Sequence, residues 1–182
     1  IINQVLFLSD EKNKMILIDI KNGNLIDELY TQPFKTVSKF KSNIAIDSKN
    51  NLLFLSTNGS LYSLNLINQK TINWIQNFKT ESEIIFDGNP INVLRDEIMV
   101  STNKNISLLN ENGARLWDLN IQSAVKPVIS GNTIFTVTSD NFLVFINKEN
   151  GKIIYSKNIN LLIAKDYKNL QRKIKKISYI FL

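Results

Sequence analysis

Short apolar runs separated by polar turn residues recur along the whole chain. Near the C-terminal end, Thr133–Thr138 alternates β-branched and aromatic residues with threonine, Phe142–Ile146 is continuously apolar, and Ile153–Ser156 is apolar again. Runs of this length and make-up indicate β-strands. The unbroken run Phe142–Ile146 predicts a strand covered on both faces. Because turn residues such as Ser139–Asn141 separate the runs, the pattern predicts an antiparallel meander.

The same order of strands and turns occurs four times in the sequence. In the group just described, Lys126–Ile129 supplies one more strand at the start, since proline is tolerated at a strand's first residue. The Asp or Asn that ends the third strand of each group marks the period. These residues are Asp19, Asn65, Asn110 and Asn147, with spacings of 46, 45 and 37 residues. Four short strands repeated at this period predict an all-β fold, a β-propeller segment of about four four-stranded antiparallel blades.

We expect a single propeller region over 1–182, with blades at about 1–31, 42–78, 89–120 and 126–158. The first blade lacks its first strand. A short amphipathic helix is predicted over 160–177, where apolar residues are spaced by three and four positions with basic residues between them. The segment 178–182 returns to strand character, as the first strand of a next blade.

These ends predict a fragment of a longer propeller. An open arc of blades would expose apolar faces. We therefore expect that the tail pairs with the first blade, or that a homodimer completes a larger ring.

Composition removes several kinds of chemistry. The 182 residues include no cysteine and no histidine. Disulfides, cysteine nucleophiles, histidine acid–base catalysis and nearly all zinc and copper sites are therefore excluded. From the sequence we name no candidate catalytic, cofactor-binding or metal-binding residue.

The net charge of +6 is concentrated in one segment near the C-terminus. Its basic residues are Lys165, Lys168, Arg172, Lys173, Lys175 and Lys176, with Asp166 as the single acid, which gives +5 there and leaves 16 basic against 15 acidic residues elsewhere. A general nucleic-acid-binding surface is not indicated. We consider these six residues a candidate partner contact; the alternative is the solvated face of a connector helix.

The residues after the third strand of each group resemble the repeat of pyrroloquinoline-quinone-type propellers, whose consensus runs Ala-Leu-Asp-x-x-Thr-Gly-Lys-x-x-Trp. In the fourth group Gly151 and Lys152 match, and Asn147, Asn150 and Tyr155 stand for the Asp, Thr and Trp. The other groups keep parts of the motif. The first has Asp19 and Gly23 but Asp27 in place of the Trp, the second has Trp74 without the Gly, and the third has Gly113 and Trp117. The resemblance covers about Val5–Lys157.

This resemblance implies a structural role for the motif residues. In such repeats the aromatic residue docks between adjacent blades. We therefore expect blade-docking roles for Trp74, Trp117, Tyr155, Gly23, Gly113 and Gly151. The Trp117–Asp118 pair also imitates the dipeptide of WD repeats, but the histidine-centred network of that family cannot form here.

Two groups of proteins share the repeat, and they imply different functions. Quinoprotein dehydrogenases bind quinone with calcium, and many place a vicinal disulfide against it, which a cysteine-free chain cannot do. Non-catalytic scaffolds such as the outer-membrane assembly lipoprotein BamB need only the propeller.

We therefore expect a non-enzymatic, BamB-like scaffold that needs no cofactor and binds other proteins through inter-blade connectors such as Thr31–Ser42, Phe78–Asn89 and Ile163–Ile177. The expected location is the periplasm, associated with the outer membrane through an N-terminal anchor outside this chain. A fragment of a quinone-dependent dehydrogenase and a ligand-binding or sensor propeller are the alternatives.

Overall fold

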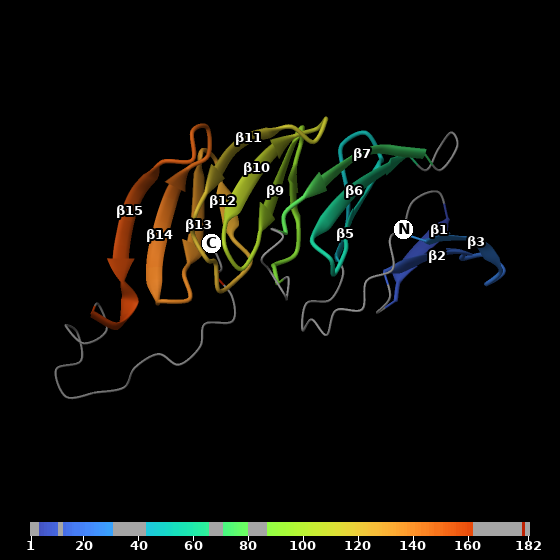
Figure 1. Ribbon diagram of the computed structural model, residues 1–182, viewed down its shortest axis with the longest axis horizontal. Coiled ribbons are helices and arrows are strands. Elements are labelled where there is room, and N and C mark those ends of the chain that lie inside the picture. The colour runs from blue at the N-terminus through green and yellow to red at the C-terminus, as the bar shows by residue number, and fades with distance from the viewer. Residues whose placement is uncertain are drawn as a thin grey trace. The chain divides into compact units, whose positions relative to one another are not determined.

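The computed structural model describes residues 4–10, 13–30, 43–65, 71–79, 87–161 and 180. These residues form four antiparallel sheets, one of three strands and three of four strands. In every sheet the hydrogen-bonded neighbours follow one another in chain order, so each sheet is a meander (Figure 1).

The strands have the following bounds. The first sheet contains β1 (Val5–Ser9), β2 (Lys14–Asp19) and β3 (Leu25–Tyr30). The second contains β4 (Asn43–Ile46), β5 (Leu52–Leu55), β6 (Ser60–Asn65) and β7 (Thr71–Asn77). The third contains β8 (Asn92–Leu94), β9 (Glu97–Ser101), β10 (Ile106–Asn110) and β11 (Arg115–Leu119). The fourth contains β12 (Val128–Ser130), β13 (Thr133–Val137), β14 (Phe142–Asn147) and β15 (Ile153–Asn158).

The all-β meander architecture predicted from the sequence is confirmed, and the described part of the chain gives the first sheet three strands. The predicted helix over 160–177 lies outside the described residues except for Asn160 and Leu161, which continue a helical turn that begins at Ile159. Of the predicted strand 178–182, only Ile180 is described. Among the described residues, no helix combines the length and the apolar character needed to cross a bilayer.

A β-bulge recurs between the last two strands of every sheet. Directly before the register shift, the paired residues are Leu17–Asp27, Ser63–Trp74, Leu108–Trp117 and Phe145–Tyr155. One residue of the outer strand is left over at each shift, as bulges require. Asp27, Trp74, Trp117 and Tyr155 therefore hold the same position in their sheets, although the turns before them differ in length.

The chain divides into two compact units, and each has its own apolar core. The first unit comprises Ile1–Asp87, Ile91–Ile98 and Glu111–Gly113; the second comprises Gly88–Pro90, Met99–Asn110 and Ala114–Leu182. In the first unit, side chains of β2 pack against those of β5 and β6; this core contains Met15, Leu17, Leu52, Phe54, Tyr62 and Leu64. In the second, side chains of the third and fourth sheets pack together; this core contains Met99, Ile106, Leu108, Ile134, Val144 and Ile146.

The prediction that β14 is covered on both faces is wrong. Val144 and Ile146 are buried, but Phe142 is 38% exposed and Phe145, on the opposite face, is only half-buried. The continuous apolar run gives the strand two apolar faces, and among the described residues only one of them has a sheet packed against it. The uncovered face of the fourth sheet is thus apolar in composition.

Candidate functional site

The turn between β14 and β15 is built by an asparagine and a glycine. The Asn147 side-chain oxygen accepts the backbone N–H of Glu149 at 2.9 Å, and the Gly151 N–H donates to the Asn147 carbonyl at 2.9 Å. Gly151 has φ +69°, in the left-handed region that glycine adopts without steric cost. The short polar side chain and the glycine thus fix the turn locally.

The ring of Trp117, from β11, lies directly on this turn. Its indole Nε1–H donates to the Lys148 carbonyl at 2.7 Å. A Cβ atom added to Gly151 would lie 2.8 Å from Trp117 Cδ2, closer than side-chain carbon atoms approach. Glycine is therefore required here twice, for the backbone angle and for the contact with the ring.

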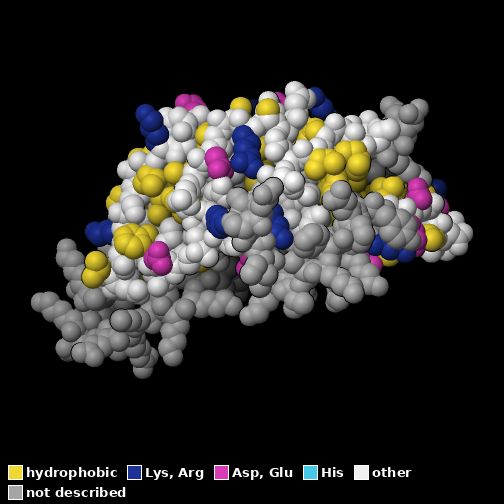
Figure 2. Space-filling model, in the orientation of Figure 1, with side chains coloured by type: hydrophobic (Ala, Val, Ile, Leu, Met, Phe, Trp, Pro, Cys, Tyr) yellow, Lys and Arg dark blue, Asp and Glu magenta, His cyan; other side chains and the backbone are white. Residues whose placement is uncertain are grey.

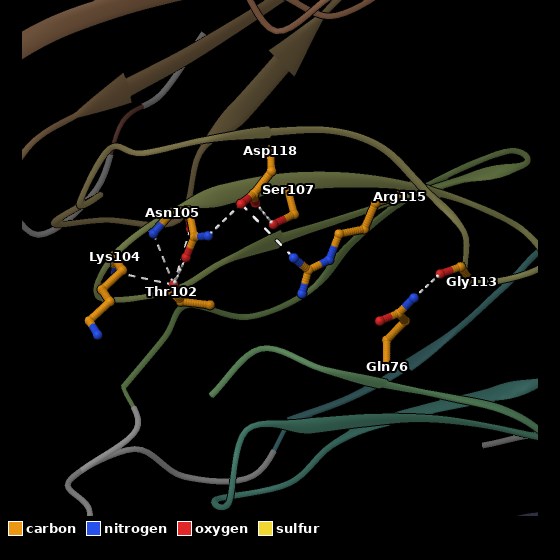
Figure 3. Close-up of polar contacts among 8 residues, drawn as sticks. All are labelled: Gln76, Thr102, Lys104, Asn105, Ser107, Gly113, Arg115 and Asp118. Atoms are coloured by element: carbon orange, nitrogen blue, oxygen red, sulfur yellow. Dashed lines mark hydrogen bonds and ion pairs between the residues drawn. The ribbon is translucent and has the colours of Figure 1, made fainter. Parts of the chain in front are cut away.

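The same contact occurs in the first unit between Trp74 and the turn before β11. The Trp74 Nε1–H donates to the Glu111 carbonyl at 3.0 Å, and a Cβ on Gly113 would lie 2.5 Å from Trp74 Cδ2. Gln76 adds a hydrogen bond from its side-chain nitrogen to the Gly113 carbonyl at 2.9 Å (Figure 3). Lys49 and Glu111 form an ion pair at 2.7 Å. Three side chains, those of Trp74, Gln76 and Lys49, therefore hold this turn.

The other two predicted docking residues, Gly23 and Tyr155, do not make an aromatic-on-glycine contact among the described residues. Gly23 has φ +74°, yet no atom of the described residues lies within 4 Å of its Cβ position. Tyr155 contacts Phe145 within its own sheet, with ring centroids 4.9 Å apart, and it is 40% exposed. The six predicted partner-contact residues between Lys165 and Lys176 lie outside the described residues.

A polar network on β10 and β11 was not anticipated from the sequence (Figure 3). The Asp118 carboxylate accepts hydrogen bonds from the hydroxyl of Ser107 and, at 2.7 Å, from the side-chain nitrogen of Asn105. Arg115 lies 3.9 Å from the same carboxylate, and the Thr102 hydroxyl accepts the backbone N–H of Asn105 at 3.0 Å. The network joins neighbouring strands without a histidine. Its hydrogen bonds connect β11 with β10 and with the loop before β10.

The described residues contain an open recess but no candidate metal site. An open recess of about 270 Å³ lies beside the fourth sheet, lined by polar residues of 120–122 and 138–140, by Ser156 and by the apolar Ile121, Phe142, Val144 and Ile153. Among the described residues, no three Asp or Glu side chains gather closely enough to hold a metal ion. The repeated, precisely packed feature of the site is therefore the pair of docked tryptophans.

Searches with the sequence matched no family model and no curated protein. Comparison of the fold with solved structures gives many matches. Three of them are BamB from Moraxella catarrhalis (14% identity, TM-score 0.63), quinohemoprotein alcohol dehydrogenase from Comamonas testosteroni (12%, 0.66) and the Cps50 (Swd1) β-propeller domain of Myceliophteria thermophila (12%, 0.59). These structures cover 84%, 87% and 85% of this chain.

The similarity establishes the fold. The neighbours are β-propellers, so the four sheets are blades of a propeller. The chain spans about half of the BamB and Cps50 chains, 49% and 51%, and 34% of the dehydrogenase. At identities of 12–14%, this similarity shows the fold and assigns no activity.

Proposed function

We propose that this chain is part of a non-catalytic propeller scaffold that binds other proteins, close in character to BamB within the pyrroloquinoline-quinone-type repeat family. In this proposal the protein works in the periplasm at the outer membrane, where it contributes to assembly of outer-membrane proteins. The blades act as a rigid frame, and the inter-blade connectors make the contacts with the partner. Loops on a rigid scaffold are the usual place for such contacts.

The observation that carries the proposal is the use of the repeated residues. The turn asparagine Asn147, the glycines Gly113 and Gly151, and the tryptophans Trp74 and Trp117 are all engaged in shaping turns or in joining sheets. The residues that repeat along the chain thus have structural roles, whereas the connectors differ in sequence from one repeat to the next. This division supports display of a binding surface rather than a reaction at a repeated site.

The test is direct binding to the purified outer-membrane assembly machinery, immobilised on a biosensor. We expect saturable binding of the chain, with a dissociation constant in the micromolar range or below. Replacing Lys165, Lys168 and Arg172 by alanine should weaken that binding. The matched control replaces Lys21, Lys126 and Lys152, three exposed lysines of the described turns, by alanine.

The two triple variants lose the same charge, so a nonspecific effect of charge lowers binding equally in both. Equal losses would remove the basic segment as the contact. No binding by the unchanged chain would remove the BamB-like assignment and leave the fold unaffected.

A quinone-dependent dehydrogenase is the second candidate, and the fold similarity to the Comamonas enzyme is the observation that favours it. Calcium takes six to eight oxygen ligands, several of them carboxylates. The described residues do not offer such a set, and the chain has no cysteine for a vicinal disulfide. Pyrroloquinoline quinone with its calcium ion therefore does not fit the described part of the chain. Thermal unfolding with and without pyrroloquinoline quinone and calcium tests this: a ligand that binds the folded state must raise the melting temperature.

A further inference from the structure

The recess beside the fourth sheet lies between two loops that are held together. They are the connector 120–125, which follows β11, and the turn between β13 and β14. The Ser139 N–H donates to the Gln122 carbonyl at 3.1 Å. The buried hydroxyl of Ser123 donates to the Val125 carbonyl at 2.6 Å and is hydrogen-bonded to the buried hydroxyl of Thr136. Both walls of the recess are therefore fixed by bonds within the second unit.

The floor of the recess can be compared with the third sheet position by position. Leu108 and Phe145 are equivalent, because each pairs with the aromatic residue directly before the bulge. Counting from this pair, the polar network of the third sheet (Figure 3) occupies the positions that β14 and β15 contribute to the recess: Asn105 corresponds to Phe142, Ser107 to Val144, Asp118 to Ser156 and Arg115 to Ile153. The third sheet fills these positions with polar side chains that contact one another, whereas the fourth sheet has three apolar side chains and one hydroxyl.

Two of the apolar floor residues are open to solvent. Phe142 is 38% exposed and Ile153 is 49% exposed, whereas Val144 is buried. Figure 2 shows hydrophobic side chains on the surface over β14 and β15. An apolar floor with a few polar groups at its rim is the composition of a ligand site. The volume of about 270 Å³ lies just below the roughly 300–1,000 Å³ of sites for drug-sized ligands, so the recess fits one ring or one branched chain.

The rim of the recess carries one charge, and this charge is negative. Its polar side chains are two amides, three hydroxyls and one carboxylate: Asn120, Gln122, Thr138, Ser139, Ser156 and Asp140. None of the described lining residues is basic, and no ion pair within the described part of the chain engages the Asp140 carboxylate. A carboxylate attracts a cation and repels an anion, and the face of an aromatic ring such as that of Phe142 also attracts cations. The recess therefore complements a positively charged group that is attached to an apolar one.

We propose that this recess binds an organic cation, an ammonium or guanidinium group carried by an aromatic or branched aliphatic body. The apolar body covers Phe142 and Ile153, and the cation lies beside Asp140. A free amine and a protein segment with an apolar residue next to a lysine present this same chemistry. The inference goes beyond the proposed scaffold function and does not require it.

The test titrates the chain with phenethylamine and follows the backbone amide resonances by heteronuclear NMR. We expect saturable shifts that map to Gln122, Ser139, Phe142 and Ile153, with a dissociation constant of about 1 mM or below. Phenethyl alcohol has the same ring without the charge and should bind about 3- to 5-fold more weakly, the range that exposed charge contacts allow. Phenylacetate, an anion, and ethylamine, a cation without a ring, should give no saturable shifts up to about 10 mM.

Two variants separate the contributions of the charge and the ring. Asp140→Asn should weaken phenethylamine binding about 3- to 5-fold and leave phenethyl alcohol binding unchanged. Phe142→Ser introduces the residue that the second sheet has at this position, Ser60, and should weaken binding of both compounds about 10-fold. The matched control is Glu149→Gln, which removes an exposed carboxylate of the fourth sheet outside the recess and should change neither affinity. Circular dichroism identical to that of the unchanged chain shows that each variant is folded.

A blocked dipeptide of phenylalanine and lysine distinguishes the two sources of the cation. Tighter binding of the dipeptide than of phenethylamine supports the site and identifies a protein segment as its ligand, and weaker binding supports the site and identifies a free amine. Three results would overturn the proposal. They are the absence of saturable shifts with both compounds, shifts that map away from the recess, and equal effects of Asp140→Asn and Glu149→Gln on phenethylamine binding.

Discussion

Gly151→Ala tests the docking contact at atomic detail. The substitution adds one methyl group in two unfavourable circumstances. The backbone angle of φ +69° costs a non-glycine residue about 1–2 kcal/mol. The new Cβ would also lie 2.8 to 3.0 Å from three atoms of the Trp117 ring, and overpacking of this kind costs about 1–3 kcal/mol. We therefore expect a total loss of about 2–5 kcal/mol in the free energy of unfolding.

A double-mutant cycle separates the two contributions. In a Trp117→Ala background the ring is gone, so Gly151→Ala should cost only the backbone contribution, about 1–2 kcal/mol. Gly23→Ala is the matched control, because its turn has the same hydrogen bonds and φ +74° but no described atom near the added methyl. It should also cost about 1–2 kcal/mol.

Urea unfolding followed by far-ultraviolet circular dichroism supplies these free energies. The reasoning is refuted if Gly151→Ala costs the same with and without Trp117, or if it costs no more than Gly23→Ala.

Three further substitutions test the turns and the inter-sheet contacts. Asp19→Asn should change the free energy of unfolding by less than about 0.5 kcal/mol, because Asn147 makes the equivalent hydrogen bond in its own turn. Asp19→Ala should cost about 1 kcal/mol. Comparable losses in the two variants would contradict a stabilising hydrogen bond from the Lys21 N–H to the Asp19 side chain. Asn13→Ala should lower the free energy of unfolding in urea by about 2–5 kcal/mol, because fully buried Asn13 accepts both the N–H and the hydroxyl of Thr57 and has φ +61°. Asn13→Gly should recover the backbone part of that loss. Glu111→Gln should cost under about 1 kcal/mol, since its partner Lys49 is 55% exposed, and a loss that persists in 1 M salt would contradict a surface ion pair.

The fold could be predicted from the sequence because its determinants are local and repeated. Alternation in runs such as Thr133–Val137 identifies strands, and turn residues such as Gly151 mark where they end. The first-sheet residue Asp27 was placed at the aromatic position by motif alignment, and the register confirms that it is the counterpart of Trp74. Each of these inferences needs only neighbours in the chain.

Polar contacts that lie outside the repeated motif could not be predicted in the same way. Nothing in the sequence around Gln76 indicates that its side chain reaches the Gly113 carbonyl, 37 residues away. The network around Asp118 was missed because its partners are Ser107 on the neighbouring strand β10 and Asn105 just before it, and no motif marks them. The apolar run of β14 predicted burial of both faces, because composition reports what a face can pack against and not whether a neighbour is there.

The central claim is that one aromatic-on-glycine contact joins successive blades, at Gly113 and at Gly151. Proton NMR of the glycine Hα resonances tests this most directly, since a tryptophan ring shifts protons above its face upfield. In dilute solution we predict strong upfield shifts at Gly113 and Gly151 that disappear in Trp74→Leu and Trp117→Leu respectively, and an ordinary shift at Gly23. Ordinary shifts at Gly113 and Gly151 in the folded chain would contradict the account.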